Sequence, residues 1–458
     1  MSNPAARGDL GELLDQQKVT AYQLFVVALC FLVMVIDGYD LFMVAMALPK
    51  IAASFGVKPA ALTPVLALQN LGLALGTAMI GIISDRYGRK KTLSFSIGAF
   101  AACTLVSTFT HDIVSFAATR LVTSFFLAGV IPNAIALTNE MSSLRFRQGF
   151  VSLVFSGYAV GAALASLAVG SVLRDFSWQA IFVTAAAAGF LILIVVVVLL
   201  PESIRFLATR ERGHAQAMRQ LRRIIPDRDI DAAILLQAGE ASPKTGRSPL
   251  RALFEGARGN LTLLMWSVFA LSFVSLSSFA ALGPVILNLT ADLPLQTAGS
   301  LMVTFSLGGL VGTAVSGFVL DRLGPKAGLT LWYAGSTACW LLFAFNVNGE
   351  ASGHIAILLA GAAMTGAQGA LNSFVATVYP TKICATGVGW AFGVGRLAGI
   401  ASPLIFSPFV AAPGLQIQYF ALLALPTFLV VFCVPFLTGA GRAAHDEAEF
   451  EREQPRSI

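Results

Sequence analysis

Gly81-Ile-Ile-Ser-Asp-Arg-Tyr-Gly-Arg-Lys-Lys91 is the stretch that decides the fold, because it occurs twice. The second copy, half a chain later, reads Gly317-Phe-Val-Leu-Asp-Arg-Leu-Gly-Pro-Lys326. A second set of glycines pairs across the chain at almost the same offset: Gly149, Gly157 and Gly161 with Gly387, Gly395 and Gly399. Two distant regions that each match a later segment at almost the same sequence offset indicate a duplicated unit. Paired halves of this kind place a substrate site between them.

The composition indicates that this unit lies in a membrane. The 458 residues are 56% hydrophobic and only 12% charged, with a mean hydropathy of +0.78. A soluble domain carries about twice that share of charge. The net charge of +6 could suggest a nucleic-acid partner. The positive residues follow membrane topology instead, so we expect no nucleic acid.

Apolar runs of about 20 residues predict membrane-spanning helices. We therefore predict an all-α integral membrane protein with twelve transmembrane helices in two pseudo-symmetric six-helix bundles. The predicted organisation is an N-terminal bundle with its tail (1–200), a linker (201–260), a C-terminal bundle (261–437) and a tail (438–458). The linker is expected to hold one amphipathic helix near 211–223, and the tail from Arg442 is expected to be disordered. The predicted spans are 22–48, 62–84, 92–109, 113–138, 149–172, 179–200, 261–287, 297–320, 327–346, 354–378, 387–410 and 416–437.

Basic residues set the orientation of these spans. With the N-terminus in the cytoplasm, only Lys50, Lys58 and Arg174 fall outside, while Arg120 and Arg396 lie within spans. Lys and Arg concentrate in cytoplasmic loops. We therefore predict a multi-pass protein of the bacterial inner membrane with both termini cytoplasmic and no cleavable signal peptide. The five cysteines lack metal-site spacing and are expected to pack, so no metal or cofactor is predicted.

The doubled loop resembles the signature of the major facilitator superfamily, and the resemblance covers nearly the whole chain. Gly81 and Gly88 permit close packing and a tight reversal, and Asp85 can accept hydrogen bonds from a neighbouring helix N-terminus. The resemblance implies a cytoplasmic gate in which Arg89 pairs with Glu140. The alternative is a basic loop that only enforces topology. The expected gate residues are Gly81, Asp85, Arg86, Gly88, Arg89, Glu140, Asp321 and Arg322. Because Pro325 stands where Arg89 would repeat, a symmetric gate is in doubt.

Only four acids or bases are predicted well inside spans, namely Asp37, Asp40, Arg120 and Arg396. A charge at the bilayer centre costs on the order of 3 kcal/mol, so each is a functional candidate. Asp37 and Asp40 share one side of a helix, and two such close carboxylates cannot easily both ionise. The four histidines are predicted to lie in loops or the tail, which leaves the two carboxylates as the proton carriers.

The two arginines are predicted to bind a carboxylate substrate, with Arg396 near mid-depth and suited to bidentate contact. The alternative is that they only neutralise Asp37 and Asp40. Other candidates could bind substrate or simply connect and pack helices. They are Asn133, Gln368, Asn372, Tyr39, Tyr158 and Trp390. The Gly157/Gly161 and Gly395/Gly399 pairs are interpreted as close helix contacts.

Shorter motifs narrow the resemblance. Asp37-Gly-Tyr-Asp40 and Tyr379-Pro-Thr381, followed by Thr386-Gly387, Trp390 and Gly393-x-Gly-Arg396, resemble the aromatic acid/proton symporter family. That resemblance implies import of a small organic acid anion with a proton, by a monomer in the lipid bilayer. Symport of a muconate-type acid, a dicarboxylate or a sugar stays open. A drug exporter is disfavoured because no proline follows Gly161 in its span, and no recognisable signalling domain supports a membrane sensor. The sequence shows no nucleophile–base pair and no metal cluster, so we do not expect an enzyme.

Overall fold

The computed structural model describes residues 19–175, 177–208, 210, 213–225, 249–256, 258–291, 295–346, 350–379, 383–411 and 416–453. Across these ranges every regular element is a helix. The first half contains α2 (Ala21–Ser54), α3 (Thr63–Tyr87), α4 (Arg89–Ser107), α5 (Ile113–Leu127), α6 (Val130–Met141), α7 (Arg147–Asp175) and α8 (Trp178–Leu199), with 3-10 turns at Pro59–Leu62 and Leu144–Phe146. The second half contains α13 (Arg258–Ala291), α14 (Leu295–Leu323), α15 (Pro325–Asn346), α16 (Glu350–Val378), α17 (Cys384–Ala411) and α18 (Gln416–Glu453).

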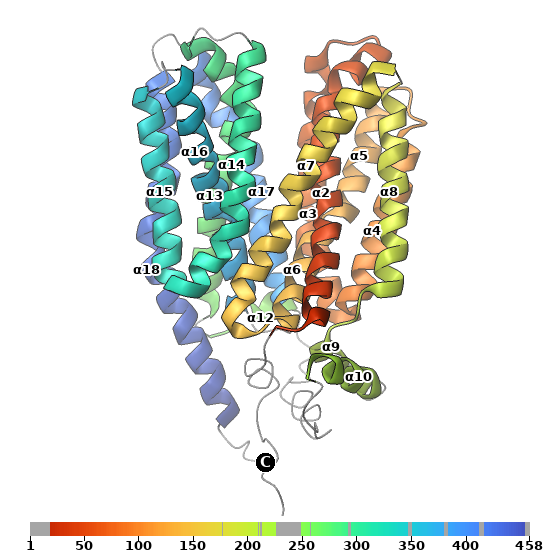
Figure 1. Cartoon of the computed structure of the whole chain (residues 1–458), viewed down its shortest axis with the longest axis vertical. Helices are drawn as coiled ribbons and strands as arrows, with labels where there is room; N and C mark the ends of the chain where they lie inside the picture. The colour runs from red at the N-terminus through yellow and green to blue at the C-terminus, as the bar shows by residue number, and fades with distance from the viewer. Residues whose placement is uncertain are drawn as a thin grey trace, which may run out of the picture.

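The helices form two bundles that lie side by side (Figure 1). α9 (Ile204–Ala208), α10 (His214–Ile224) and α12 (Pro249–Ala252) all lie at one end of them, called here the linker end (Figure 1). α2 begins and α18 ends at this same end (Figure 1). The bundles meet mainly where α3 packs on α17 and α7 packs on α14. The two lines of contact correspond under the sequence repeat.

Ten helical stretches in the described part of the chain are long and apolar enough to cross a membrane. They include all the predicted spans except those that became α4 and α17. α4 opens on Arg89, Lys90 and Lys91, so it is less apolar than its neighbours α3 and α5. The all-α membrane fold is confirmed, while the count of twelve crossings stays a prediction.

The predicted span 113–138 is divided between α5 and α6, which are separated at Ala128 and Gly129. Pro132 explains the break, because it has no N–H to bond the carbonyl of Ala128 and its ring crowds that carbonyl. A Cβ on Gly129 would collide with the Ser96 side chain of α4. The interruption therefore lets α4 approach closely.

Two expectations about the ends of helices are wrong. The backbone of α18 continues to Glu453, so the tail is helical where disorder was expected from Arg442. Its sequence there is rich in Ala, Glu and Arg, which favour helix. His354 lies exposed in α16, and His214 begins α10, so neither is in a loop. The predicted linker helix is present as α10.

Glycines bring α2 and α7 into close contact in the first half. A Cβ on Gly38 would collide with the carbonyl of Tyr158, and one on Gly161 with the carbonyl of Val35. In the second half Gly395 and Gly399 lie against the side chains of Phe273 and Ser277 of α13. Side chains this small let helix backbones approach in a membrane, as the sequence predicted.

Candidate functional site

At the linker end, one aspartate from each half caps a helix of the other half. Asp85, near the end of α3, accepts hydrogen bonds from the backbone N of Thr386 at 2.9 Å and from its Oγ1 at 2.6 Å, in the first turn of α17. Asp321, near the end of α14, accepts from the backbone N of Gln148 at 3.2 Å and of Gly149 at 2.7 Å, in the first turn of α7. A helix N-terminus carries partial positive charge and unpaired N–H groups, which a carboxylate satisfies.

Glycines make both capping contacts sterically available. A Cβ on Gly81 would press against the carbonyl of Ala385, and one on Gly317 would collide with the carbonyl of Gln148. The loops that follow turn through Gly88, with φ 106°, and Gly324, with φ 79°. Residues other than glycine rarely adopt a positive φ of this size. The doubled motif therefore builds the same contact twice, and the expected asymmetry does not extend to these caps.

A charged network surrounds the first cap. Arg89 pairs with Asp85 at 3.0 Å and with Glu140 at 3.1 Å, as the resemblance implied. These three side chains are almost fully buried. Glu202 accepts hydrogen bonds from the backbone N of Arg89 at 2.8 Å and of Lys90 at 3.1 Å, and so caps α4. Glu140 also accepts a hydrogen bond from the Ser203 hydroxyl.

The remaining expected gate residues lie at the margin of this network. Arg86 is exposed and stacks over Tyr87, and its carbonyl accepts a hydrogen bond from Arg210 at 3.2 Å. Arg322 is exposed at the end of α14. Glu202 was not among the residues predicted from the sequence. A proline followed by an acid directly after a span was the available signal.

Deeper in the first half, Asp40 of α2 forms an ion pair with Arg120 of α5. Both side chains are fully buried, and the Arg120 guanidinium also lies 5.7 Å from the ring centroid of Phe182. Arg120 is therefore held inside one bundle by a carboxylate and an aromatic ring. This arrangement matches the ion-pair alternative for Arg120. Nε and Nη1 of Arg120 and Oδ1 of Asp40 have no hydrogen-bond partner.

Asp37, one helical turn before Asp40, has different neighbours. It lies within electrostatic range of Arg396 of α17, and Tyr158 of α7 lies within range of both. Asp37 is 2% exposed and Arg396 8% exposed, yet no ion pair within 4.0 Å joins them in the described structure. Oδ2 of Asp37 and Nε of Arg396 have no hydrogen-bond partner. A buried acid and a buried base from opposite halves thus lie within electrostatic range of each other, with bonding capacity left over.

An aromatic cluster lies beside this pair. Tyr158 stacks on Phe155 with centroids 6.0 Å apart, and Phe155 meets Phe392 of the other half at 6.0 Å. Phe392 precedes Arg396 by one helical turn, so the two share a face of α17. The sequence analysis selected Tyr158 but missed Phe155 and Phe392, because aromatic residues inside apolar spans carry no pattern that separates a binding wall from packing.

Gln368 and Asn372 form part of a buried polar chain in the second half. Ser272 donates to Oε1 of Gln368 at 2.6 Å and accepts from Tyr333 at 3.0 Å, while Gln368 donates to Asn372 at 2.9 Å. Nδ2 of Asn372 has no partner. An unpaired buried donor is costly unless a ligand satisfies it. Asn372 is therefore the member of this polar network with a donor left for a ligand.

Three other candidates lie apart from the inter-half pair. Asn133 is used by its own half, since it accepts from Ser84 and donates to the Gly129 carbonyl at 2.6 Å. Tyr39 packs against the core cluster around Phe116 and Trp178. Trp390 stacks on Trp266 at 5.5 Å, about one and a half helical turns from Arg396 along α17. These contacts favour structural roles for Asn133 and Tyr39, while Nε1 of Trp390 has no hydrogen-bond partner.

Two helical bundles that cap each other's helices, with a buried acid–base pair between them, define a membrane transporter. The chain belongs to the Major Facilitator Superfamily, whose family model matches residues 30–403. It is 28% identical to a gallate transporter of Pseudomonas putida over 93% of this chain and 94% of that one. It is 31% identical to the 3-(3-hydroxy-phenyl)propionate transporter of Escherichia coli K12 over 84% of this chain and 86% of that one.

A 4-hydroxybenzoate transporter, PcaK of Pseudomonas aeruginosa, is 28% identical over 93% of this chain and 95% of its own. Among solved structures, the proton:xylose symporter XylE bound to 6-bromo-6-deoxy-D-glucose superposes with a TM-score of 0.73 over 90% of this chain and 95% of that one, at 17% identity. These relatives are transporters and not enzymes, so the sequence-based expectation of a transporter is confirmed. The structural likeness supports the fold alone.

Proposed function

We propose that this protein is a proton-coupled symporter that imports a small aromatic carboxylate by alternating access. One observation carries the proposal. Asp37 and Tyr158 of the first half face Arg396 of the second half, and the two charged groups keep unused hydrogen-bonding atoms. The aromatic-acid names of the curated relatives support the same substrate class.

Arg396 is proposed to bind the substrate carboxylate. Its guanidinium has donors in a fixed fork, which suits a carboxylate bidentately. Nε is without a partner, and no carboxylate lies within ion-pair distance in the described residues. Phe155, Tyr158 and Phe392 would hold the ring, because aromatic rings stack or meet edge to face at such separations. Asn372 would donate to a ring hydroxyl through its free Nδ2.

Charge balance explains why a proton would accompany the acid. Asp37 and Arg396 together are neutral, so a bound carboxylate would leave one uncompensated negative charge in a buried site. Burying an unpaired charge is expensive. A proton on Asp37 restores neutrality, so acid and proton are expected to bind with positive coupling. Asp40, whose charge Arg120 already compensates, is the weaker candidate for the proton.

The caps at the linker end are proposed to be the gate. Asp85 and Asp321 hold the halves together there, while the substrate pair lies deeper between them. Release to the linker side would require both caps to break. On the predicted orientation, that side is the cytoplasm.

Transport into proteoliposomes tests the proposal. With an imposed inward proton gradient, we expect accumulation of benzoate-type acids and counterflow among them, with weaker responses to muconate, dicarboxylates and xylose. Arg396→Lys keeps the charge but loses the fork, so affinity should fall. Arg396→Ala should lose uptake of the acid and affect its neutral amide much less. The exposed Arg222→Ala on α10 is the matched control.

Three results would count against the proposal. Equal losses for the acid and its amide would make Arg396 structural. A preference for sugars would remove the aromatic-acid substrate. The absence of counterflow with every compound in the panel would argue against transport of these classes.

A further inference from the structure

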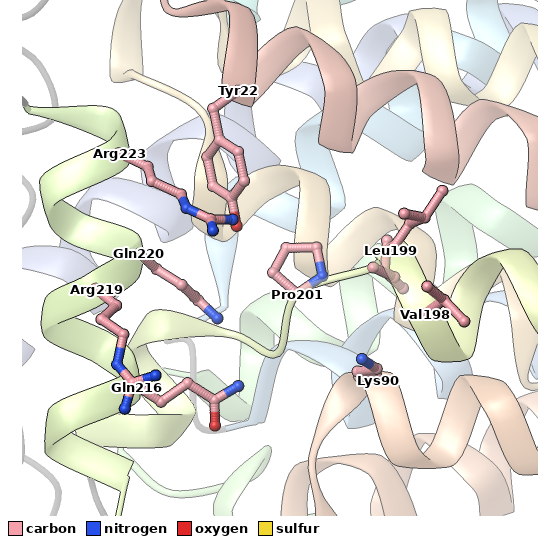
Figure 2. Close-up of a pocket in the computed structure, with 10 residues that line it drawn as sticks. Tyr22, Lys90, Val198, Leu199, Pro201, Gln216, Arg219, Gln220 and Arg223 are labelled. Atoms are coloured by element: carbon pink, nitrogen blue, oxygen red, sulfur yellow. The ribbon is translucent and has the colours of Figure 1, made fainter.

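A second concave site lies away from the inter-half region, at the linker end of the first half (Figure 2). It is a cavity of about 220 Å³ between α10, the start of α2 and the end of α8. Pockets that enclose a whole small molecule typically measure about 300–1,000 Å³, so this one suits a headgroup-sized ligand. Its polar lining residues are Tyr22, Lys90, Gln216, Arg219, Gln220 and Arg223.

Three cations and no acid line this cavity. Lys90 comes from the first turn of α4, while Arg219 and Arg223 are one turn apart on α10 (Figure 2). No ion pair joins any of them to a carboxylate of the described residues. Arg223 lies 5.7 Å from the ring centroid of Tyr22, which orients it without neutralising it. Like charges one turn apart repel. An anion in the cavity would relieve that repulsion.

Gln220 adds a buried amide with an unused hydrogen-bonding atom to this lining. Its side chain is 6% exposed, lines the cavity and has Oε1 without a hydrogen-bond partner. A buried polar atom left unpaired costs about 1–3 kcal/mol. Because the two ends of an amide can exchange by a flip, Gln220 can present its donor to an anion without moving its backbone.

The cavity opens onto surface that lipid would cover. Leu199 and Val198 belong to its wall, and Val198 is 70% exposed. Further along α8, Ile194 is 61% exposed and Leu191 63% exposed, which forms an apolar stripe on a candidate membrane span. A basic cavity at the end of an apolar stripe is complementary to an amphiphile with an anionic head.

We propose that this cavity binds the phosphate headgroup of an anionic membrane phospholipid, with its acyl chain along α8. The phosphate would contact Arg219, Arg223 and Lys90, and so would bridge α10 to the first turn of α4. Basic residues near a membrane surface each contribute about 1 kcal/mol to the binding of anionic lipid. The stripe on α8 favours a lipid over a free phosphate ion, which has no use for an apolar wall.

Lipid titration of the delipidated full-length protein tests this proposal. Native mass spectrometry and thermal melting would follow the addition of phosphatidylglycerol, phosphatidylcholine or inorganic phosphate. We expect phosphatidylglycerol to bind and raise the melting temperature, with phosphatidylcholine and phosphate having little effect. Arg219→Gln or Arg223→Gln should weaken phosphatidylglycerol binding about fivefold each, from about 1 kcal/mol per charge. Arg219→Lys keeps the charge and should weaken it less.

Arg222→Gln is the matched control, because Arg222 is exposed on the same helix but does not line the cavity. It should change the affinity less than twofold. An equal loss in Arg222→Gln would indicate a diffuse basic surface and overturn the site. Equal protection by inorganic phosphate would make it a free-anion site, and equal binding of phosphatidylcholine would remove the anionic headgroup. Melting of each variant in phosphatidylcholine shows whether it is folded before affinities are compared.

Discussion

Asp321→Asn should weaken the closure of the linker end without touching the substrate pair. In the structure Asp321 accepts hydrogen bonds from Gln148 and Gly149 at the start of α7. Asparagine keeps an acceptor oxygen but loses the charge. Bonds to charged groups contribute about 1 kcal/mol more than neutral ones. Two such bonds give about 2 kcal/mol, which partial exposure of Asp321 reduces to about 1 kcal/mol by solvent screening.

A loss of about 1 kcal/mol raises the population of molecules open at the linker end about fivefold. The reporter is Cys384 at the start of α17, which is fully buried beside the first cap. With the other four cysteines replaced by alanine, its alkylation by a maleimide should follow opening. Asp85→Asn should raise the rate about thirtyfold, since its side chain is buried and the full 2 kcal/mol applies.

The two variants have different weaknesses as evidence. Asp85 lies within electrostatic range of Cys384, so its loss also alters the thiol directly. Asp321→Asn avoids this, because it caps α7 and not α17. Asp112→Asn is the matched control. Asp112 caps α5 by accepting a hydrogen bond from the backbone N of Ser115 at 2.8 Å, and this contact lies within one half. Hydrogen bonds from Ser115 hold the pKa of Asp112 below its ordinary value, so it too is charged at neutral pH.

The reasoning fails if Asp321→Asn alkylates within twofold of the parent protein. It also fails if Asp112→Asn accelerates the reaction as much, because the increase would then reflect general loosening. Saturating substrate should leave the ratio of the Asp321→Asn and parent rates unchanged, since the cap does not contact the substrate pair.

Further predictions concern coupling, the gate network and packing. Asp37→Asn should abolish proton-driven accumulation with expression intact, and Asp40→Asn should have a similar or smaller effect; uptake in Asp37→Asn that an uncoupler still collapses normally would remove that residue from the role. Arg89→Ala should slow transport with little change in ligand affinity, since it leaves Glu140 buried without its cation, and lost binding in detergent with normal exchange rates would refute a gate. Gly38→Ala should lower stability by about 1–3 kcal/mol through overpacking against α7, whereas Gly335→Ala, with open space around its Cα, should stabilise or be neutral in the same thermal melt.

Much of the architecture could be predicted from local pattern. Apolar runs located most spans to within a few residues, since a bilayer sets the length of a crossing helix. The prediction failed at helix ends, as at Arg442 and His354, because hydropathy does not register helix propensity or the start of a turn. It also missed the break at Gly129, although Pro132 was a visible cause.

The sequence by itself determined which residues were candidates for function. A charge within an apolar span is expensive wherever it ends up, so Asp37, Asp40, Arg120 and Arg396 were identifiable from composition alone. The doubled loop likewise specified Asp85 and Asp321, because glycine and aspartate at a helix end have few other uses. Both predictions depend on the residue type at a single position and on the lipid that surrounds the chain.

Only the tertiary structure decided how those residues are partnered. Asp37 and Asp40 are one helical turn apart, yet Asp40 pairs with Arg120 inside one bundle and Asp37 faces Arg396 across the two. Sequence spacing fixes a direction around one helix and says nothing of which helix lies there. That choice depends on where glycines such as Gly38 let helices approach, and on which halves meet. The division between a structural ion pair and a proposed transport site is therefore a property of packing.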